Sequence, residues 1–373
     1  MPLRFHWRLP LGGETSPITR VTMSERPETG LPDLDAQVSF CRRAEEAGID
    51  SLLIDFGASK PDPILLAAAL GMAARQIKFI VAYRSGLIAP TSFVQQLNTL
   101  SALIEGRFSL NIVAGYSTAE QMFYGDFLAH DERYERTDEF LAICRGLWSR
   151  QADFSFSGKY YRMGSGRLNT PFMSPDRPFP EILVSGSSPP ARQLALRQGT
   201  CWMRLADRPE VLRAMTAPVA EQGLDVGVRM SVICRETREE AVDAGRKLIQ
   251  AAESATSIVR GAERQFVDNV DSKSIKATFD LAESEWLTSY LWTGAVRSHG
   301  APSIALVGTP EEIASAIMDY RSVGVTQFIL SGWPKLDEMI FFGRRVIPIV
   351  RVLERAATRH QPPYSEAAEE RFG

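Results

Sequence analysis

The stretch Arg107-Phe-Ser-Leu-Asn-Ile-Val-Ala-Gly115, followed by a polar loop and by His130-Asp-Glu-Arg-Tyr134, is the most informative part of this sequence. The apolar run has the length of a buried strand, whereas the residues from His130 onward follow a helical pattern. His130 and Tyr134 are four residues apart, so they lie on one face of the expected helix. An ordinary solvated helix start offers the same spacing, so spacing alone assigns no function.

Seven further apolar runs of strand length alternate with amphipathic helical stretches around this segment. Such alternation is typical of βα units with a parallel sheet, and eight units close into a (β/α)8 TIM barrel. We therefore expect an α/β fold with a single barrel domain over residues 1–360. The eight expected strands are Leu3–Pro10, Ser51–Asp55, Ile77–Tyr83, Arg107–Gly115, Glu181–Gly186, Cys201–Leu205, Val226–Arg235 and Gln327–Gly332.

Two insertions interrupt this alternation. Residues 151–180 lack a regular period and favour a small β excursion over Phe154–Tyr161. Residues 254–303 form a segment longer than most simple connections, and segments of that length are often lids or disordered. We interpret this one as a lid because it contains side chains that commonly cover a ligand, namely Trp286, Tyr290, Trp292 and Arg297. The polar tail 361–373 is expected to be loose.

Composition narrows the possible functions. The chain has 42 basic and 45 acidic residues and a net charge of −3, so we expect no nucleic-acid partner. The N-terminus has no apolar signal region and no long apolar run occurs, which predicts a cytoplasmic protein without a membrane segment. The four cysteines are far apart, form no CxxC pair and are expected to be buried free thiols. With four histidines, a multi-histidine metal site is not expected.

The active site of such a barrel lies at the carboxyl ends of the strands. The residues expected there include no carboxylate pair for glycoside hydrolysis, no Gly-x-Ser-x-Gly motif and no cluster of metal ligands, which suggests that a bound cofactor carries the reaction. Ser185-Gly-Ser-Ser188 lies at a strand-to-helix turn and could bind a phosphate, although serine is also a common N-cap. Arg229 and Arg297 could bind an anionic group; alternatively, Arg229 forms an ion pair at the rim.

Six motifs together give a family resemblance. The chain resembles the bacterial luciferase-like flavin-dependent monooxygenases, and within them the alkanesulfonate and dimethyl-sulfone monooxygenase branch, from Phe5 to about Glu354. The motifs are Glu45-Glu-Ala-Gly-Ile-Asp50, Arg107–Gly115, His130–Tyr134, Phe179-Pro-Glu-Ile-Leu-Val-Ser-Gly-Ser-Ser188, Ala305-Leu-Val-Gly-Thr-Pro-Glu-Glu312 and Phe328-Ile-Leu-Ser-Gly332.

The resemblance implies a TIM barrel that receives reduced FMN from an NAD(P)H:flavin reductase and uses O2 to oxygenate a small organic substrate. Relatives are commonly dimers or tetramers. His130 and Tyr134 would contact the flavin phosphate and ribityl chain, with Gly115 beside them. The resemblance also assigns cofactor roles to the opposite side of the phosphate site and to the isoalloxazine ring, carried by Gly186, Ser187, Ser188 and the segment from Asp55 to Ala58.

The substrate side departs from the sulfonate enzymes. Arg229 and Arg297 match arginines of their substrate pocket and lid. Ser231 and Gly12, however, stand where those enzymes have histidines, and Lys60 and Trp333 replace a cysteine and a tyrosine. The candidate catalytic residues are therefore Arg229, Ser231, Arg297 and Trp333. We expect a substrate other than a simple alkanesulfonate, and Trp286, Trp292 and Trp333 suggest a larger apolar or aromatic one.

The type of oxygenation stays open at this point, and a Baeyer–Villiger-type insertion and a heteroatom oxidation both fit the resemblance. A second hypothesis keeps the barrel but uses the deazaflavin F420 as a hydride carrier. A third is a flavin-binding protein without turnover, which the missing polar residues of the substrate side motivate.

Overall fold

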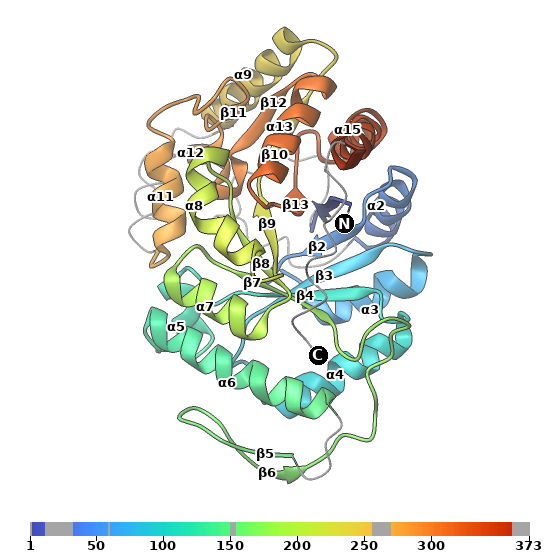
Figure 1. Cartoon of the computed structure of the whole chain (residues 1–373), viewed down its shortest axis with the longest axis vertical. Coiled ribbons are helices and arrows are strands. Elements are labelled where there is room, and N and C mark those ends of the chain that lie inside the picture. The colour runs from blue at the N-terminus through green and yellow to red at the C-terminus, as the bar shows by residue number, and fades with distance from the viewer. Residues whose placement is uncertain (1, 12–32, 59, 150–153, 256–269, 360–373) are drawn as a thin grey trace.

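The computed structural model describes residues 2–11, 33–58, 60–149, 154–255 and 270–359. Eight parallel strands close into a barrel in the order β1-β13-β9-β8-β7-β4-β3-β2, so the predicted TIM barrel is confirmed (Figure 1). Its strands are β1 (Arg4–Arg8), β2 (Ser51–Ile54), β3 (Lys78–Tyr83), β4 (Phe108–Ile112), β7 (Glu181–Ser185), β8 (Cys201–Leu205), β9 (Asp225–Arg229) and β13 (Gln327–Leu330). Gly12 and the tail 361–373 lie outside the described residues.

Helices follow the strands and surround the barrel (Figure 1). Several begin with proline at the first or second position, where a missing N–H costs no hydrogen bond. The helices are α2 (Leu34–Glu46), α3 (Pro63–Ala73), α4 (Pro90–Leu103), α5 (Thr118–Phe123), α6 (His130–Trp148), α7 (Pro189–Gln198), α8 (Pro209–Ala220), α13 (Pro310–Ser322), α14 (Lys335–Phe341), the π-helical η3 (Phe342–Val346) and α15 (Ile347–Arg359).

The barrel interior is apolar in its middle and charged at its amino end. Alternate residues of five strands form a small internal core: Leu53, Ile80, Ala82, Leu183, Cys201, Met203 and Ile329. Below it, Arg4 on β1 binds Glu181 at 2.7 Å and Asp225 at 2.5 Å. Side chains on a strand alternate between faces, so Arg4, His6 and Arg8 share the inner face, and Arg8 reaches the carboxyl end where the site lies.

The expected seventh strand, Val226–Arg235, is wrong as a single element. The chain leaves the barrel at Met230, and Ser231–Cys234 forms β10 in a second sheet with β12 (Ala305–Gly308) and β11 (Leu291–Trp292). Both halves are apolar, so the sequence pattern does not reveal the break. The physical reason is a change of partner: β9 pairs with β8 and β13, whereas β10 pairs in parallel with β12.

The described part of the 254–303 insertion is folded. After α9 (Arg238–Ala255), residues 270–303 form α11 (Lys273–Leu281), β11, α12 (Val296–His299) and η2 (Ala301–Ser303). In Figure 1, β11 and α12 lie near α9, whereas α11 lies at the side of the barrel next to α8. This segment therefore contributes a strand and two helices to the structure, while residues 256–269 lie outside the described part.

The other insertion forms an antiparallel pair, β5 (Phe154–Ser157) and β6 (Arg162–Gly166). The expected excursion over Phe154–Tyr161 thus covers one strand and the turn. The Glu139 carboxylate on α6 accepts the backbone N–H groups of Lys159 at 2.7 Å and Tyr160 at 2.8 Å. This insertion is therefore fixed to α6, the helix that carries His130 and Tyr134.

All four cysteines are buried free thiols, as expected. Within the described ranges, no helix has the length and apolarity needed to cross a membrane.

Candidate active site

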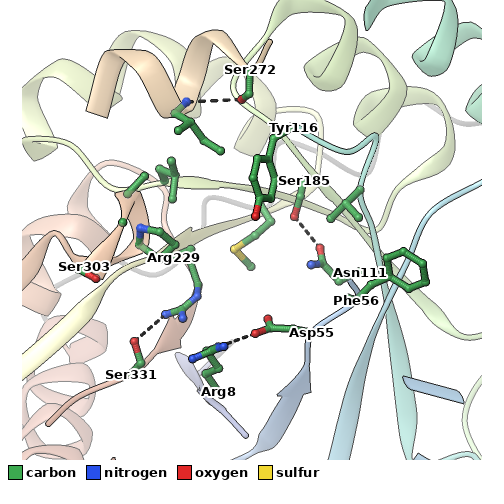
Figure 2. Close-up of a pocket in the computed structure, with 18 of the residues that line it drawn as sticks. Arg8, Asp55, Phe56, Asn111, Tyr116, Ser185, Arg229, Ser272, Ser303 and Ser331 are labelled. Atoms are coloured by element: carbon green, nitrogen blue, oxygen red, sulfur yellow. Dashed lines mark hydrogen bonds and ion pairs between the residues drawn. The ribbon is translucent and has the colours of Figure 1, made fainter. Parts of the chain in front are cut away.

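A cavity of about 820 Å³ opens at the carboxyl end of the barrel. Every barrel strand contributes at least one side chain at or just beyond its end, and Figure 2 shows several of them pointing toward one another. The insertion forms a further wall through Ser272, Ser274, Ile275, Phe279 and the residues from Arg297 to Ser303. The cavity is therefore enclosed by both the barrel and the segment that was interpreted as a lid.

The structure brings eight of the predicted site residues to the cavity surface. They are Asp55, Ala58, Gly115, Tyr134, Gly186, Arg229, Arg297 and Trp333. Four others do not line it, namely His130, Ser187, Ser188 and Ser231.

The turn between β7 and α7 meets Tyr134 closely. Gly186 has a φ of +140°, and a Cβ there would lie 2.5 Å from the Tyr134 hydroxyl. The Tyr134 hydroxyl donates to the Ser185 carbonyl at 3.4 Å, and the Trp202 indole donates to the Gly186 carbonyl at 2.7 Å. Glycine is thus required both for the backbone conformation and for the close approach.

Tyr134 can act as a hydrogen-bond donor at this turn over the whole neutral range. Burial raises its pKa to about 12, and a hydrogen bond with Ser188 only partly opposes that effect. Ser188 is also the N-cap of α7, where its hydroxyl accepts the Ala191 N–H at 3.4 Å. The capping role expected for serine is therefore present. Pro189 and Pro190 have no N–H, and the Ala191 and Arg192 N–H groups both bind Ser188, so the first turn of α7 offers an anion its dipole but no free N–H group.

His130 lies next to this corner at the first position of α6. Its Nδ1 is 2.6 Å from the Asp131 carboxylate, and its ring centroid is 5.1 Å from that of Tyr134. The imidazole is about one-fifth exposed. The two side chains thus share one helix face, as the spacing predicts, with Tyr134 facing the cavity and His130 behind it.

The turn after β4 forms the adjoining wall. Gly115 has a φ of +80°, and a Cβ there would lie 2.3 Å from Gln121 Nε2 and 3.2 Å from Arg84 Nε. On β4 itself, Asn111 Oδ1 accepts the Ser185 hydroxyl at 2.5 Å (Figure 2). These contacts tie β4 to β7, and the Asn111 and Ser185 side chains line the cavity beside the Gly115 backbone.

Charged residues cluster on the opposite wall. Asp55 at the end of β2 binds Arg8 Nε at 2.5 Å and Lys60 Nζ at 3.1 Å (Figure 2). Burial alone would raise the pKa of Asp55, but Arg8, Lys60 and Arg229 together hold it well below the usual carboxylate range. Asp55 is therefore ionised at neutral pH and is unsuited to act as a general acid.

Arg229 lies between this cluster and β13. Its Nη1 donates to the carbonyls of Met230 at 2.8 Å and Ile329 at 3.2 Å, and to the Ser331 hydroxyl at 3.3 Å (Figure 2). Ser231 lies behind Ser331, fully buried, and its hydroxyl donates to the Pro302 carbonyl at 2.9 Å. Ser231 Oγ is also 2.9 Å from Ser331 Oγ. Ser231 thus supports the partner of Arg229 and does not face the cavity.

The interpretation that three tryptophans face a ligand is wrong for two of them. Trp292 is 2% exposed and packs in the core of the second sheet, against Ile233 and Val307. Trp286 packs on Trp292, with ring centroids 6.4 Å apart. Trp333 does line the cavity, where its ring meets that of His299 edge to face at 5.3 Å. The presence of several aromatic residues in a segment does not show whether they pack in a hydrophobic core or line a ligand-binding cavity.

Several cavity residues were not assigned a role from the sequence. They are Arg84, Arg204, His299 and Lys335. Burial and the nearby positive charge of Lys335 lower the pKa of His299 to about 4, so the imidazole is neutral at pH 7. Within the described ranges, no group of three or more His, Cys, Asp or Glu side chains is placed to hold a metal ion.

A model of one protein family, described as luciferase-like monooxygenase, matches residues 14–327 of this chain. The chain belongs to the luciferase-like monooxygenase family. This result agrees with the expected family and identifies the protein as an enzyme, and the cavity at the carboxyl end of its barrel is the candidate active site.

Solved structures with the same fold include enzymes with different cofactors. EDTA monooxygenase from Chelativorans sp. BNC1 is 20% identical, with a TM-score of 0.73 over 95% of this chain and 94% of that one. The oxygenating constituent of 3,6-diketocamphane monooxygenase from Pseudomonas putida, a type II Baeyer–Villiger monooxygenase in complex with FMN, is 20% identical, with a TM-score of 0.64 over 93% and 99%. An F420-dependent secondary alcohol dehydrogenase in complex with an F420-acetone adduct is also 20% identical, with a TM-score of 0.64 over 94% and 100%. At these identities the likeness concerns the fold.

Proposed function

We propose that this luciferase-like monooxygenase is the oxygenating component of a two-component system that takes reduced FMN from an NAD(P)H:flavin reductase. The observation that carries the proposal is the corner formed by Tyr134, the Gly186 turn and the first turn of α7, which opens onto a cavity with an apolar floor. A phosphate fits the corner because the Tyr134 hydroxyl can donate a hydrogen bond to it and the dipole at the start of α7 favours an anion there. The apolar floor, which includes Ala82 and Met203, suits a planar ring.

Each of the residues has a role in this scheme. Tyr134 donates a hydrogen bond to the phosphate or ribityl chain, and Gly115 and Gly186 leave room for the chain to pass. Bound reduced flavin would supply the electrons that activate O2. The residues from Arg297 to Ser303 and α11 line one side of the cavity; with the cofactor bound they would limit the access of bulk water, which would strengthen the electrostatic contacts inside it. His130 orients Tyr134 from behind by ring contact.

We further propose that the substrate is an organic molecule other than a simple alkanesulfonate. The Ser231 hydroxyl is engaged with Pro302 and Ser331, and Lys60 is engaged with Asp55, so neither replaces the polar donors of the sulfonate enzymes. Trp333 offers an apolar face, and Arg229 and Arg297 offer positive charge at the cavity surface. A molecule with one apolar part and one hydrogen-bond-accepting group, such as a ketone or a thioether acid, matches this wall.

Anaerobic titration with reduced FMN tests the cofactor. We expect saturable binding in the micromolar range or tighter, and with a reductase, NADH and an accepted substrate we expect one oxygen atom from 18O2 in the product. Absence of binding to reduced FMN would sink the proposal.

A second candidate function is F420-dependent hydride transfer, because an F420 enzyme shares the fold at the same level of similarity. Parallel titrations with reduced FMN and reduced F420 distinguish the two, since quenching of Trp202 fluorescence beside the Gly186 turn reports on either cofactor. A flavin-binding protein without turnover is distinguished by the 18O2 experiment, in which it would release only hydrogen peroxide.

A further inference from the structure

Arg84 is the first residue beyond β3, and its side chain faces the cavity. Ala82 on β3 faces the interior of the barrel. Arg84 comes two residues later, and side chains two residues apart on a strand point to the same face. The residue is 3% exposed, and it lines the cavity. Its guanidinium is therefore a buried positive charge beside the expected place of the flavin ring.

Only part of this guanidinium is satisfied by the protein. Nη2 binds the Glu120 carboxylate at 2.6 Å, whereas Nε and Nη1 are buried without a hydrogen-bond partner among the described residues. An arginine side chain carries five N–H groups, and each one buried without an acceptor costs about 1–3 kcal/mol. The unpaired N–H groups thus call for an acceptor that enters the cavity.

The guanidinium is held firmly from its other side. Arg84 Cζ lies 5.0 Å from the centroid of the Phe56 ring and 5.6 Å from that of Tyr124. Glu120 accepts the Ala58 N–H at 3.0 Å as well, so the ion pair links the end of β3 to the loop after β2. Gly115 also lies close to the guanidinium, since a Cβ there would stand 3.2 Å from Arg84 Nε.

We propose that Arg84 contacts the electron-rich edge of the reduced flavin ring and makes the site selective for reduced over oxidised flavin. This inference rests on the proposed function. The reduced ring loses a proton near neutral pH and becomes an anion, whereas the oxidised ring is neutral. A buried cation discriminates between the two because Coulomb interactions are stronger in a cavity than in water. Glu120 does not cancel the effect, since it binds the Nη2 edge and leaves Nε and Nη1 for the ligand.

The test compares the dissociation constants for oxidised and reduced FMN in the wild-type enzyme, Arg84→Met and Arg84→Lys. We expect the wild type to bind reduced FMN more tightly, and Arg84→Met to lower the ratio of the oxidised to the reduced constant at least tenfold. The midpoint potential of bound FMN should fall with it, by about 30 mV for each tenfold change. Arg84→Lys, which keeps the charge, should retain most of the preference.

Arg107→Met is the matched control. Arg107 is a partly buried arginine whose donors reach the carbonyls of Ile77 at 3.0 Å and Gly71 at 2.6 Å, and it does not line the cavity. This variant should keep the wild-type ratio. If Arg84→Met fails to fold by circular dichroism, Arg84→Gln takes its place.

The possible outcomes separate this inference from the proposed function. The role of Arg84 is overturned if Arg84→Met or Arg84→Gln keeps the wild-type ratio of the dissociation constants for oxidised and reduced FMN. It is also overturned if the variant loses affinity equally for both forms of FMN. Either result leaves the proposed function intact. A wild-type enzyme that binds neither redox state of FMN overturns both.

Discussion

The two walls of the cavity recognise ligands by different means. The wall of β4, β7, α6 and α7 presents turns, two glycines with positive φ, and a helix start. The wall of β1, β2, β9 and β13 presents charged side chains around Asp55. Three of the six family motifs, Arg107–Gly115, His130–Tyr134 and Phe179–Ser188, contribute to the first wall, whereas Lys60 and Trp333, which depart from the sulfonate enzymes, lie on the second. Backbone shape can bind a cofactor common to many enzymes, while side chains can be exchanged to suit a substrate.

Gly186→Ala is the substitution from which we expect the largest effect on the first wall. The new Cβ would lie 2.5 Å from Tyr134 Oη and 2.8 Å from the Ala191 Cβ, at a φ unfavourable for alanine. We expect FMN to bind about 100-fold more weakly, equivalent to about 2.7 kcal/mol, measured by fluorescence titration. Gly164→Ala is the control, since a Cβ there meets no atom within 4 Å. Equal affinities in the two variants would contradict a backbone-built cofactor wall.

Asp55→Asn tests the charged wall. The substitution leaves Arg8 and Lys60 without their shared carboxylate, and Arg229 without its nearby negative charge. Because these side chains are partly exposed, we expect a loss of about 1–3 kcal/mol in the free energy of unfolding, less than for a fully buried pair. Urea unfolding gives this value, and because Asp55 begins the segment expected at the isoalloxazine ring, FMN affinity should also fall, but by less than the 100-fold expected for Gly186→Ala. A variant that loses FMN binding but keeps its stability would show that the two walls are not separate.

Acidification should act first on the insertion that forms the further wall, where His299 contacts Trp333. The pKa of His299 is lowered to about 4 in the folded protein, below its usual value of 6.5. As the pH falls from 7 toward 4, the unfolded chain therefore takes up this proton first, and stability is lost over that window. We expect His299 to account for about 2 kcal/mol of destabilisation at pH 5 relative to pH 7.

The measurement is the difference in unfolding free energy between pH 7 and pH 5, in the wild type and in His299→Asn. A smaller difference in the variant is expected, and an identical one would refute the assignment. Tyr134 stays protonated throughout this range because burial raises its pKa to about 12, so its contribution to FMN binding should not change.

Tyr134→Phe is the mildest test of the first wall. It removes one hydroxyl that donates to the Ser185 carbonyl and faces the expected phosphate site. We expect FMN affinity to fall about fivefold, or about 1 kcal/mol, the usual scale of one hydrogen bond. His130→Ala should have a similar or smaller effect, because His130 contacts Tyr134 and does not line the cavity. An effect larger in His130→Ala than in Tyr134→Phe would reverse their roles.

The sequence predicts the barrel well because each strand is a short apolar run with a helix after it. It also predicts which residues meet at the carboxyl ends, since parallel strands bring these ends together. It does not predict the break at Met230, because β9 and β10 are both apolar and their different partners are distant in sequence. The burial of Trp292 and Ser231, and the unpaired nitrogens of Arg84, likewise depend on side-chain packing.

The break at Met230 also links two parts of the enzyme mechanically. Arg229 ends a barrel strand, and Ser231, two residues later, begins the strand that holds the second sheet. A core substitution in that sheet, such as Val307→Ala, would shift β10 and with it the arginine at the cavity, although Val307 does not line the cavity. For one substitution before Met230 and one after it, the changes in free energy should therefore not be additive. Substrate preference could then change through residues that never touch the substrate.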